Sequence, residues 1–378
     1  MPSQLTSRVP VPLKPNSAGI RMANLWRWPM VIALALVVIT FVFSFGCSGN
    51  GENPSKEVLE HSAPKNPVPL LGWETVATPG PTPGNRSRHG LAYDQSTKST
   101  ILFGGVVWDD EHSHLCDDTW EFDGKTWKQI KGDSSPSSRF RSGMVYLDSL
   151  KSTVLFGGAD ADDKVLGDTW IYANHNWNSL PIAGNSKPSA RGGHCLCADE
   201  SAGVAVMFGG FDEQNNTLGD TWVFENNVWK NIEGPGPSPR RYASFAYHPG
   251  MQGCFLHGGT YDDNGDQMYG DSWLFKDQKW TRLAAKFDTS ARDDHGLIFH
   301  RAANKMIMLE GVSAERGLLT LNEDGWELVS PNPIHPRHQA TPIVWHEGLN
   351  GVLMYGGEAY HAGPQFESTT ILHMPKSK

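Results

Sequence analysis

The sequence predicts an all-β protein in which one small antiparallel sheet is repeated along most of the chain. Three observations favour this fold class: the composition, a recurring Gly-Gly pair and a recurring pattern of tryptophans. The 378 residues include 40 Gly, 25 Pro and 14 Trp, and only 19% are charged. Such a mixture is typical of many short strands joined by turns rather than of long helices.

The Gly-Gly pairs each follow a short apolar run, as in Thr-Val-Leu-Phe at residues 153–156. Successive pairs lie roughly 50 residues apart, which indicates a repeat architecture. Glu310-Gly311 occupies the place of a pair between the last two. We expect the glycines to supply positive φ angles or a close backbone approach. The pairs are Gly104-Gly105, Gly157-Gly158, Gly209-Gly210, Gly258-Gly259 and Gly356-Gly357.

Three more columns keep step with the glycines. An Arg precedes each pair, an Asp-Thr-Trp triplet or a close variant follows it, and a second Trp comes after the triplet. A buried guanidinium needs acceptors, so we expect the Arg and Asp columns to pair. We expect the Trp columns to pack between repeats, with a carbohydrate platform as the alternative. The Arg column is Arg86, Arg139, Arg191, Arg240, Arg292 and Arg337; the triplets begin at Asp118, Asp168, Asp220 and Asp271; the second Trp is Trp127, Trp177, Trp229, Trp280 or Trp326.

These columns resemble the kelch repeat over residues 73–374. The resemblance implies a β-propeller with one four-stranded blade per repeat. The residues agree with it, since each repeat holds four apolar runs of strand length and one such sheet needs neighbours on both faces. The sixth repeat ends before its outer Trp, whereas Trp73 precedes the first repeat as an orphan. We therefore predict an all-β, six-bladed kelch β-propeller over residues 69–378, closed by an N-terminal outer strand that contains Trp73.

The N-terminal part predicts an export segment followed by a tether. Residues 1–28 carry basic residues and no acid, and residues 29–45 form an uncharged apolar run that ends shortly before Cys47. This order is typical of a secretory signal, and the run is also near the lower length of a membrane span. We predict a signal peptide or membrane anchor over residues 1–47 and a flexible linker over residues 48–68.

The end of the apolar run carries a second resemblance. Residues 44–47, Ser-Phe-Gly-Cys, resemble a bacterial lipobox, in which the Cys receives lipid; Ser44 stands where that pattern usually has Leu. Lipidation at Cys47, a retained anchor and a cleaved signal remain open alternatives. Each of them places the rest of the chain outside the cytoplasm, in a bacterial cell envelope and attached to its membrane unless the signal is cleaved.

The charge distribution excludes one class of partner and suggests another. The formal net charge is -9, so nucleic acid is not expected as a partner. The loops after the Gly-Gly pairs are acidic and would open on one face of a propeller. That face would attract cations, cationic peptides or Ca²⁺, and a plain solvated rim is the alternative. The candidates are Asp109, Asp110, Glu111, Asp162, Asp163, Asp212, Asp262 and Asp263.

A histidine stands three residues after the Arg in alternate repeats, at His89, His194 and His295. This position begins the innermost strand, near the channel that a propeller leaves at its centre. Three imidazoles that met there could bind Zn²⁺ or Cu²⁺, or a polar ligand without a metal. Packing combined with a turn hydrogen bond is the alternative. We predict no metal and no cofactor.

The loop after the first Gly-Gly pair is the most varied in chemistry. Residues 108–116 read Trp-Asp-Asp-Glu-His-Ser-His-Leu-Cys. A single loop supplies too few ligands for a Cys/His metal site. We interpret it as a recognition loop with Trp108 exposed, and His112 and His114 as further binding candidates.

Cysteines are few for an exported protein. After Cys47 the chain has only Cys116, Cys195, Cys197 and Cys254. Cys195 and Cys197 lie on one face of one strand and cannot easily pair with each other. We expect buried free thiols, with a bridge from either to Cys254 in the next blade as the alternative.

The sequence therefore favours a monomeric binding or scaffolding propeller that recognises a protein or glycan ligand through its loop faces. The fold by itself does not choose among activities. The alternative is a sugar-active enzyme, because proteins of similar fold include galactose-oxidase-like copper enzymes and sialic-acid epimerases. We identify neither the Tyr/His copper set of the first nor a nucleophile–base signature, and we assign no catalytic residue.

Overall fold

The computed structural model describes residues 72–108, 113–182, 187–262, 266–309, 311–312, 317–330, 341–357 and 368–375, apart from the side chain of Trp108. The predicted signal segment, the lipidation site and the linker lie outside these residues. The described part is all-β, and its helices are two 3-10 turns, η1 (Ala285–Phe287) and η2 (Glu347–Leu349). No helix within these ranges is long and apolar enough to cross a membrane.

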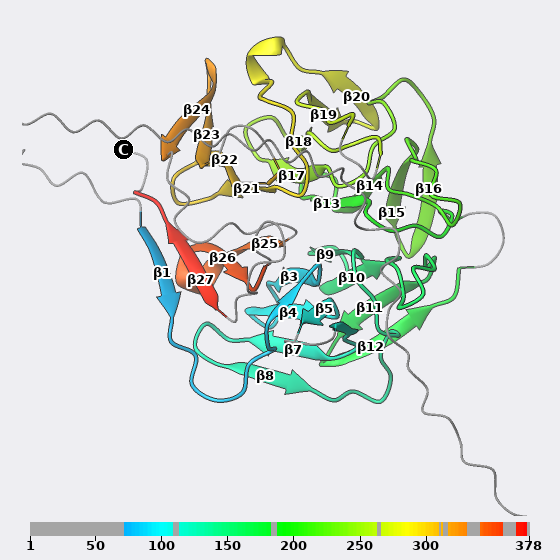
Figure 1. Ribbon diagram of the computed structural model, residues 1–378, viewed down its shortest axis with the longest axis vertical. Coiled ribbons are helices and arrows are strands. Elements are labelled where there is room, and N and C mark those ends of the chain that lie inside the picture. Colours follow the sequence, from blue (N-terminus) through cyan, green and yellow to red (C-terminus); the bar gives the residue numbers. More distant parts are fainter. Residues whose placement is uncertain are drawn as a thin grey trace, which may run out of the picture. The chain divides into compact units, whose positions relative to one another are not determined.

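Four-stranded antiparallel sheets repeat along the described ranges (Figure 1). In each of these sheets the strands follow chain order, except that two short strands intervene in the first sheet and that the first described strand joins the last sheet. The first sheet contains β3 (Gly90–Asp94), β4 (Ser99–Phe103), β7 (Thr119–Phe122) and β8 (Trp127–Ile130); the second contains β9 (Gly143–Leu147), β10 (Ser152–Phe156), β11 (Thr169–Ala173) and β12 (Asn176–Leu180); the third contains β13 (Cys195–Asp199), β14 (Val204–Phe208), β15 (Thr221–Glu225) and β16 (Val228–Ile232); the fourth contains β17 (Ser244–His248), β18 (Gly253–His257), β19 (Ser272–Lys276) and β20 (Lys279–Arg282); the fifth contains β21 (Gly296–His300), β22 (Lys305–Leu309), β23 (Leu318–Asn322) and β24 (Gly325–Ser330); the sixth contains β25 (Ile343–His346), β26 (Gly351–Tyr355), β27 (Thr369–His373) and β1 (Gly72–Val76).

Neighbouring sheets pack face against face. The first strand of each sheet contacts the first strand of the next, and β25 contacts β3, so the series returns to its start. Figure 1 shows these first strands around a common centre, with the last strands on the outside. Apolar side chains fill each interface, as where Val154 and Phe156 of the second sheet meet Ala205 and Met207 of the third. This architecture is consistent with a kelch propeller.

The sixth sheet confirms the predicted role of the N-terminal strand. β1 pairs antiparallel with β27, and Trp73 lies opposite Leu372. The Trp73 side chain also packs against an apolar cluster that includes Trp345 and Val352. The strand that begins the described chain therefore completes the sheet that ends it.

The Arg and Asp columns pair as predicted. Arg191 is fully buried, and its two Nη atoms donate to the Asp220 carboxylate at 2.6 and 2.8 Å. Trp222 Nε1 donates to the same carboxylate at 2.7 Å. Burial alone would raise the pKa of Asp220, but the hydrogen bonds and charge of Arg191 and the Trp222 bond outweigh it and lower the pKa. The equivalent pairs are Arg86–Asp118, Arg139–Asp168 and Arg240–Asp271.

The second Trp column joins neighbouring sheets, as predicted. Trp229 is only 1% exposed, and its Nε1 donates to Thr169 Oγ1 of the preceding sheet at 3.0 Å. Its ring lies edge-on against Phe156, with 5.2 Å between centroids. Buried in this way, Trp229 has no face open to a sugar. The same hydrogen bond joins Trp127 to Thr369, Trp177 to Thr119 and Trp280 to Thr221.

The Gly-Gly pairs turn the chain where two sheets approach. Gly209 and Gly210 have φ angles of +68° and +97°. A Cβ on Gly209 would lie 2.2 Å from the carbonyl oxygen of Arg240 in the next sheet. Positive φ and close backbone approach are both present here, as expected.

One further sheet was not predicted. β2 (Arg86–Ser87), β5 (Val106–Trp108) and β6 (Ser113–Leu115) form a three-stranded antiparallel sheet. In other repeats the equivalent residues form only a single antiparallel β-bridge, such as that between Phe140 and Ala159. The residue after each buried Arg thus pairs with the residue after a Gly-Gly pair. This pairing holds the loop face beside the start of the innermost strand.

Candidate functional site

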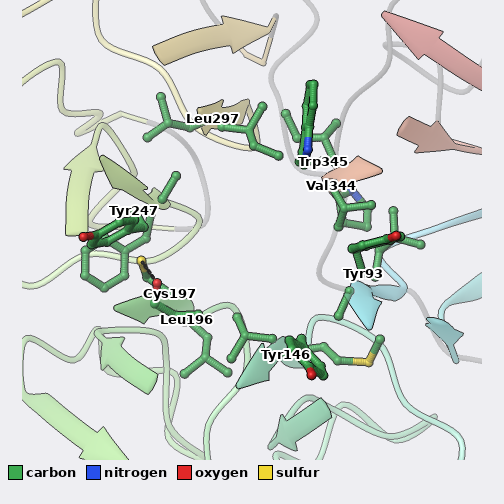
Figure 2. Close-up of a pocket in the computed structure, with 18 of the residues that line it drawn as sticks. Tyr93, Tyr146, Leu196, Cys197, Tyr247, Leu297, Val344 and Trp345 are labelled. Atoms are coloured by element: carbon green, nitrogen blue, oxygen red, sulfur yellow. Dashed lines mark hydrogen bonds between the residues drawn. The ribbon is translucent and has the colours of Figure 1, made fainter. Parts of the chain in front are cut away.

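The first strands of the sheets enclose a central cavity of about 620 Å³. Figure 2 shows Leu196, Leu297 and Val344 at its wall, together with Tyr93 and Tyr247. A cavity of this size is in the range of small-molecule sites. The residue before the last of the first strand is Tyr93, Tyr146, Ala198, Tyr247, Phe299 or Trp345 in the successive sheets.

These aromatic side chains also tie one sheet to the next. The Phe299 ring packs on His248 at 5.3 Å between centroids, and the Trp345 ring packs on His300 at 4.9 Å. His248 and His300 also accept hydrogen bonds through Nδ1 from backbone N–H groups of their own turns. Phe299 and Trp345 are therefore engaged in packing, and the lining of the central cavity is mixed, because it also includes the charged residues Asp148, Glu200 and Arg301.

A smaller cavity of about 170 Å³ lies at the end of the channel where the first strands begin. We call it the channel mouth. Three of its wall residues are the predicted histidines, which the structure therefore brings to one cavity. The residues that line it are Arg88, His89, Arg141, Ser142, Gly193, His194, Tyr242, Ala243, Ser244, Asp294, His295, Thr341 and Pro342.

A chain of backbone hydrogen bonds frames the channel mouth. The residue two places after each buried Arg has a φ angle between 48° and 62° in the five sheets where this position is described. In four successive sheets its N–H donates to the carbonyl of its counterpart in the preceding sheet, at 2.9 to 3.1 Å. The residues are Arg88, Arg141, Gly193, Tyr242 and Asp294. Non-glycine residues in this conformation are uncommon and gather at functional sites.

The side chains of this frame divide the channel mouth by charge. Arg88 and Arg141 come from the first and second sheets, and Asp294 comes from the fifth. The Arg141 guanidinium stacks on the Tyr242 ring at 4.2 Å and donates to its hydroxyl. Sequence reasoning missed these residues. The signal that could have found them is their position in the repeat, which lies between the Arg column and the His column.

A buried carboxyl group lies beside the frame. Asp293 is 8% exposed, and burial raises its pKa to about 8, with the charge of Asp294 adding to the effect and that of Arg141 opposing it. The group is therefore mainly neutral at pH 7. Its Oδ1 atom has no hydrogen-bond partner within the described ranges. The face around the channel mouth can thus offer guanidinium donors on one side and carboxyl groups on the other.

The three histidines lie between sheets. The His194 ring packs edge-on against Phe156 of the preceding sheet at 5.6 Å, and the His295 ring against His257 at 5.4 Å. Neither ring nitrogen of His89, His194 or His295 has a hydrogen-bond partner among the described residues. In the same part of the chain no group of three or more His, Cys, Asp or Glu side chains is placed to hold a metal ion. The shared metal site weighed from the sequence is therefore absent from the described residues.

Buried imidazoles should make the protein less stable in acid. Burial is the main cause that lowers the pKa of His89, His194 and His257 to about 3. An unfolded histidine titrates near pH 6.5, so below this pH the unfolded chain binds protons that the folded chain excludes. Each of the three then lowers the free energy of unfolding by up to about 1.4 kcal/mol per pH unit. Asp293 has the opposite effect between pH 8 and 3.8, because there its carboxyl group binds a proton in the folded chain but not in the unfolded one. It is one group, and the three histidines outweigh it.

We therefore expect a lower melting temperature at pH 5 than at pH 7.5. The variant His194→Leu should show a smaller difference between the two pH values, because it no longer titrates. His114→Leu is the matched control, since His114 is exposed on β6. A pH difference that is the same in His194→Leu as in the native chain would contradict this origin.

The acidic loops lie on the same face as the channel mouth, because the second strand of each sheet ends where the first begins. Their first aspartates are engaged in turns. Asp212 Oδ1 accepts from the backbone N–H groups of Gln214 and Asn216 at 3.0 and 2.8 Å, and Asp262 Oδ1 accepts from Asp266 at 3.0 Å. Asp162 and Asp163 are exposed.

The predicted recognition loop is described only at its edges. Asp109, Asp110, Glu111 and His112 lie outside the described residues, as does Asp263 of a later loop. Trp108 ends β5 and pairs with Ser113 in the β5–β6 hairpin. His114 is exposed on β6 and lies opposite Val107. Val106 of this hairpin is buried against Phe140 and Ala159 of the next repeat, with Leu115 beside them.

Comparisons with known proteins support the kelch-repeat interpretation. Residues 172–357 match the family model of the KLHDC2/KLHL20/DRC7 Kelch-repeats domain. The chain is 26% identical to the dynein alpha chain, flagellar outer arm, of Chlamydomonas reinhardtii over 46% of this chain and 4% of that one. It is 29% identical to an F-box/kelch-repeat protein of Arabidopsis thaliana, over 37% and 32% of the two chains. It is 30% identical to tRNA wybutosine-synthesizing protein 4 of Aspergillus fumigatus, over 33% and 12%. The match therefore spans less than a third of each of these relatives.

Proposed function

We propose that this chain is a six-bladed kelch propeller that binds and positions a protein partner outside the cytoplasm. The six four-stranded sheets are the blades, and β1 closes them into a ring. The contacts of β25 with β3 and of β1 with β27 support this closure. Dynein and F-box proteins among the relatives favour a protein-interaction role over a catalytic one.

The channel mouth carries this proposal. Five sheets repeat the same backbone there but present Arg88, Arg141, Gly193, Tyr242 and Asp294 in turn. A fixed frame with variable side chains is what recognition requires. The partner inserts a polar segment between the arginine side and the carboxyl side, while the acidic loops attract its basic surroundings over longer distances.

The same proposal includes a membrane attachment. The apolar run at residues 29–45 and the lipobox-like Cys47 support a tether to the outer surface of a bacterial cytoplasmic membrane, with residues 48–68 as the linker. Anchoring would hold the loop face near partners in the cell envelope.

A thermal-shift screen of the full chain tests the binding site. The panel contains peptides with acidic and with basic residues, mono- and oligosaccharides, and Zn²⁺, Cu²⁺ and Ca²⁺. A ligand that binds only the folded chain must raise its melting temperature. We expect a subset of peptides to do so, and Arg141→Glu to weaken their binding about tenfold or more, because it reverses a charge at the channel mouth.

Lys128→Glu is the matched control, since Lys128 is exposed on the outer strand β8 and lies far from the first strands in its sheet. Its peptide affinity should equal that of the native chain. Equal affinity in the Arg141→Glu variant, or no peptide response at all, would contradict the proposal. A sugar response followed by a new product would instead favour the sugar-active enzyme.

A further inference from the structure

Two cysteines from neighbouring sheets meet in the core. Cys197 lies on β13 of the third sheet, Cys254 lies on β18 of the fourth, and their Sγ atoms are 2.6 Å apart. They are 3% and 0% exposed, and both thiols are free in this structure. This separation is well inside a nonbonded contact of two sulfur atoms and close to the bond length of about 2.05 Å. A small side-chain adjustment brings the atoms to bonding distance.

The surroundings of the two thiols are apolar. They pack with Val206, Val223 and Phe275 in one cluster, and the strands β13 and β18 are themselves in contact. A metal would need further ligands, and the described residues contain no group of three suitable side chains. Two facing thiols in an apolar cluster can pair with each other.

We propose that Cys197 and Cys254 form a disulfide bond that joins the third sheet to the fourth. The bond forms by thiol–disulfide exchange with a disulfide donor such as glutathione disulfide. One cysteine attacks the donor and releases one thiol; the second cysteine attacks the mixed disulfide and releases the other. The two cysteines lose two electrons and two protons, which appear in the two released thiols.

The depth of burial indicates when the bond forms. Burial raises the pKa of Cys197 and raises that of Cys254 further, so the folded thiols stay protonated. The attacking species is the thiolate, and the folded thiols are only 3% and 0% exposed. The exchange therefore takes place while the fourth sheet is docking onto the third, and the finished bond is shielded from reductants.

A neighbouring cysteine provides a matched control. Cys195 lies two residues before Cys197 on the same strand and is also buried. Its Sγ atom packs near Phe208 and Leu256 and donates to the Phe208 carbonyl at 3.4 Å. Cys195 shares the strand, burial and chemistry of Cys197, but it has no facing thiol.

The test is refolding of the full chain. The reduced chain is unfolded in denaturant and refolded with a mild detergent in a buffer of reduced and oxidised glutathione. Free thiols are then alkylated under denaturing conditions, and the peptides are examined by mass spectrometry without reduction. We expect the peptides of Cys197 and Cys254 to be linked and lighter by two hydrogen atoms, and Cys195 and Cys116 to carry the alkyl label.

Stability provides the second readout. The chain refolded without a disulfide donor, or the variant Cys197→Ala/Cys254→Ala, should melt about 5 °C or more below the chain refolded with oxidised glutathione. The variant Cys195→Ala should keep both the link and the higher melting temperature after refolding with oxidised glutathione. Alkyl label on both Cys197 and Cys254, or a link between Cys195 and Cys254, would overturn the proposal. The mass measurement uses the native sequence and does not depend on whether a variant folds.

Discussion

Replacing Asp271 with alanine is expected to lower the free energy of unfolding by about 3–5 kcal/mol. Arg240 is only 1% exposed and donates to Asp271 at 2.6 and 3.1 Å. The variant leaves this guanidinium buried without its counter-charge, and Trp273 Nε1 loses its acceptor as well. Chemical denaturation of the full chain, followed by tryptophan fluorescence, measures the change.

The control for this variant is Asp148→Ala. Asp148 also accepts from a cation, Lys151, but both side chains are well exposed, at 62% and 65%. Solvent screens such a pair, so no measurable loss is expected. Similar losses in the two variants would show that Asp271 acts as an ordinary surface charge.

Trp229→Ala should cost about 3–5 kcal/mol of unfolding free energy, which is usual for a large aromatic removed from a packed core. The ring fills the interface between the second and third sheets, against Phe156 and Phe224. Its removal leaves a cavity there and an unused Thr169 hydroxyl. Thermal and denaturant unfolding of the variant measure the loss.

Two milder variants separate the causes. Thr169→Val removes only the acceptor of the Trp229 hydrogen bond and should cost about 1 kcal/mol. Val228→Ala changes the preceding residue on the same strand, which is 44% exposed, and should stay within about 0.5 kcal/mol. An effect of Val228→Ala as large as that of Trp229→Ala would mean that strand β16, rather than the buried ring, determines stability.

The features that could be predicted from the sequence are those that repeat. A buried Arg such as Arg191 needs an acid, and the Asp of the next triplet is at a constant distance along the chain, so the pair was predictable from chemistry and spacing. The outer strand with Trp73 was predictable because the Trp column was one member short. Repetition turns a weak local signal into a strong one.

The candidate site was predicted less well, because it depends on how the repeats differ. Arg88, Arg141, Tyr242 and Asp294 share a backbone conformation but not one common residue type, so the sequence shows no column at this position. The acidic residues were recognised as a group, yet Asp212 and Asp262 are engaged in hydrogen bonds within their own turns. Composition gives the charge of a face, whereas the hydrogen bonds decide which carboxylates are available.

The pairing of β1 with β27 has a consequence for synthesis. β1 is the first of the described strands to be made, and its partner β27 is incomplete until residues 369–373 have been made. Until then the chain carries an unpaired strand and an open sixth sheet, so closure must be among the last folding events. A chain that lacks residues 369–378 would keep five of the described four-stranded sheets complete but would lose β27, the strand with which β1 pairs.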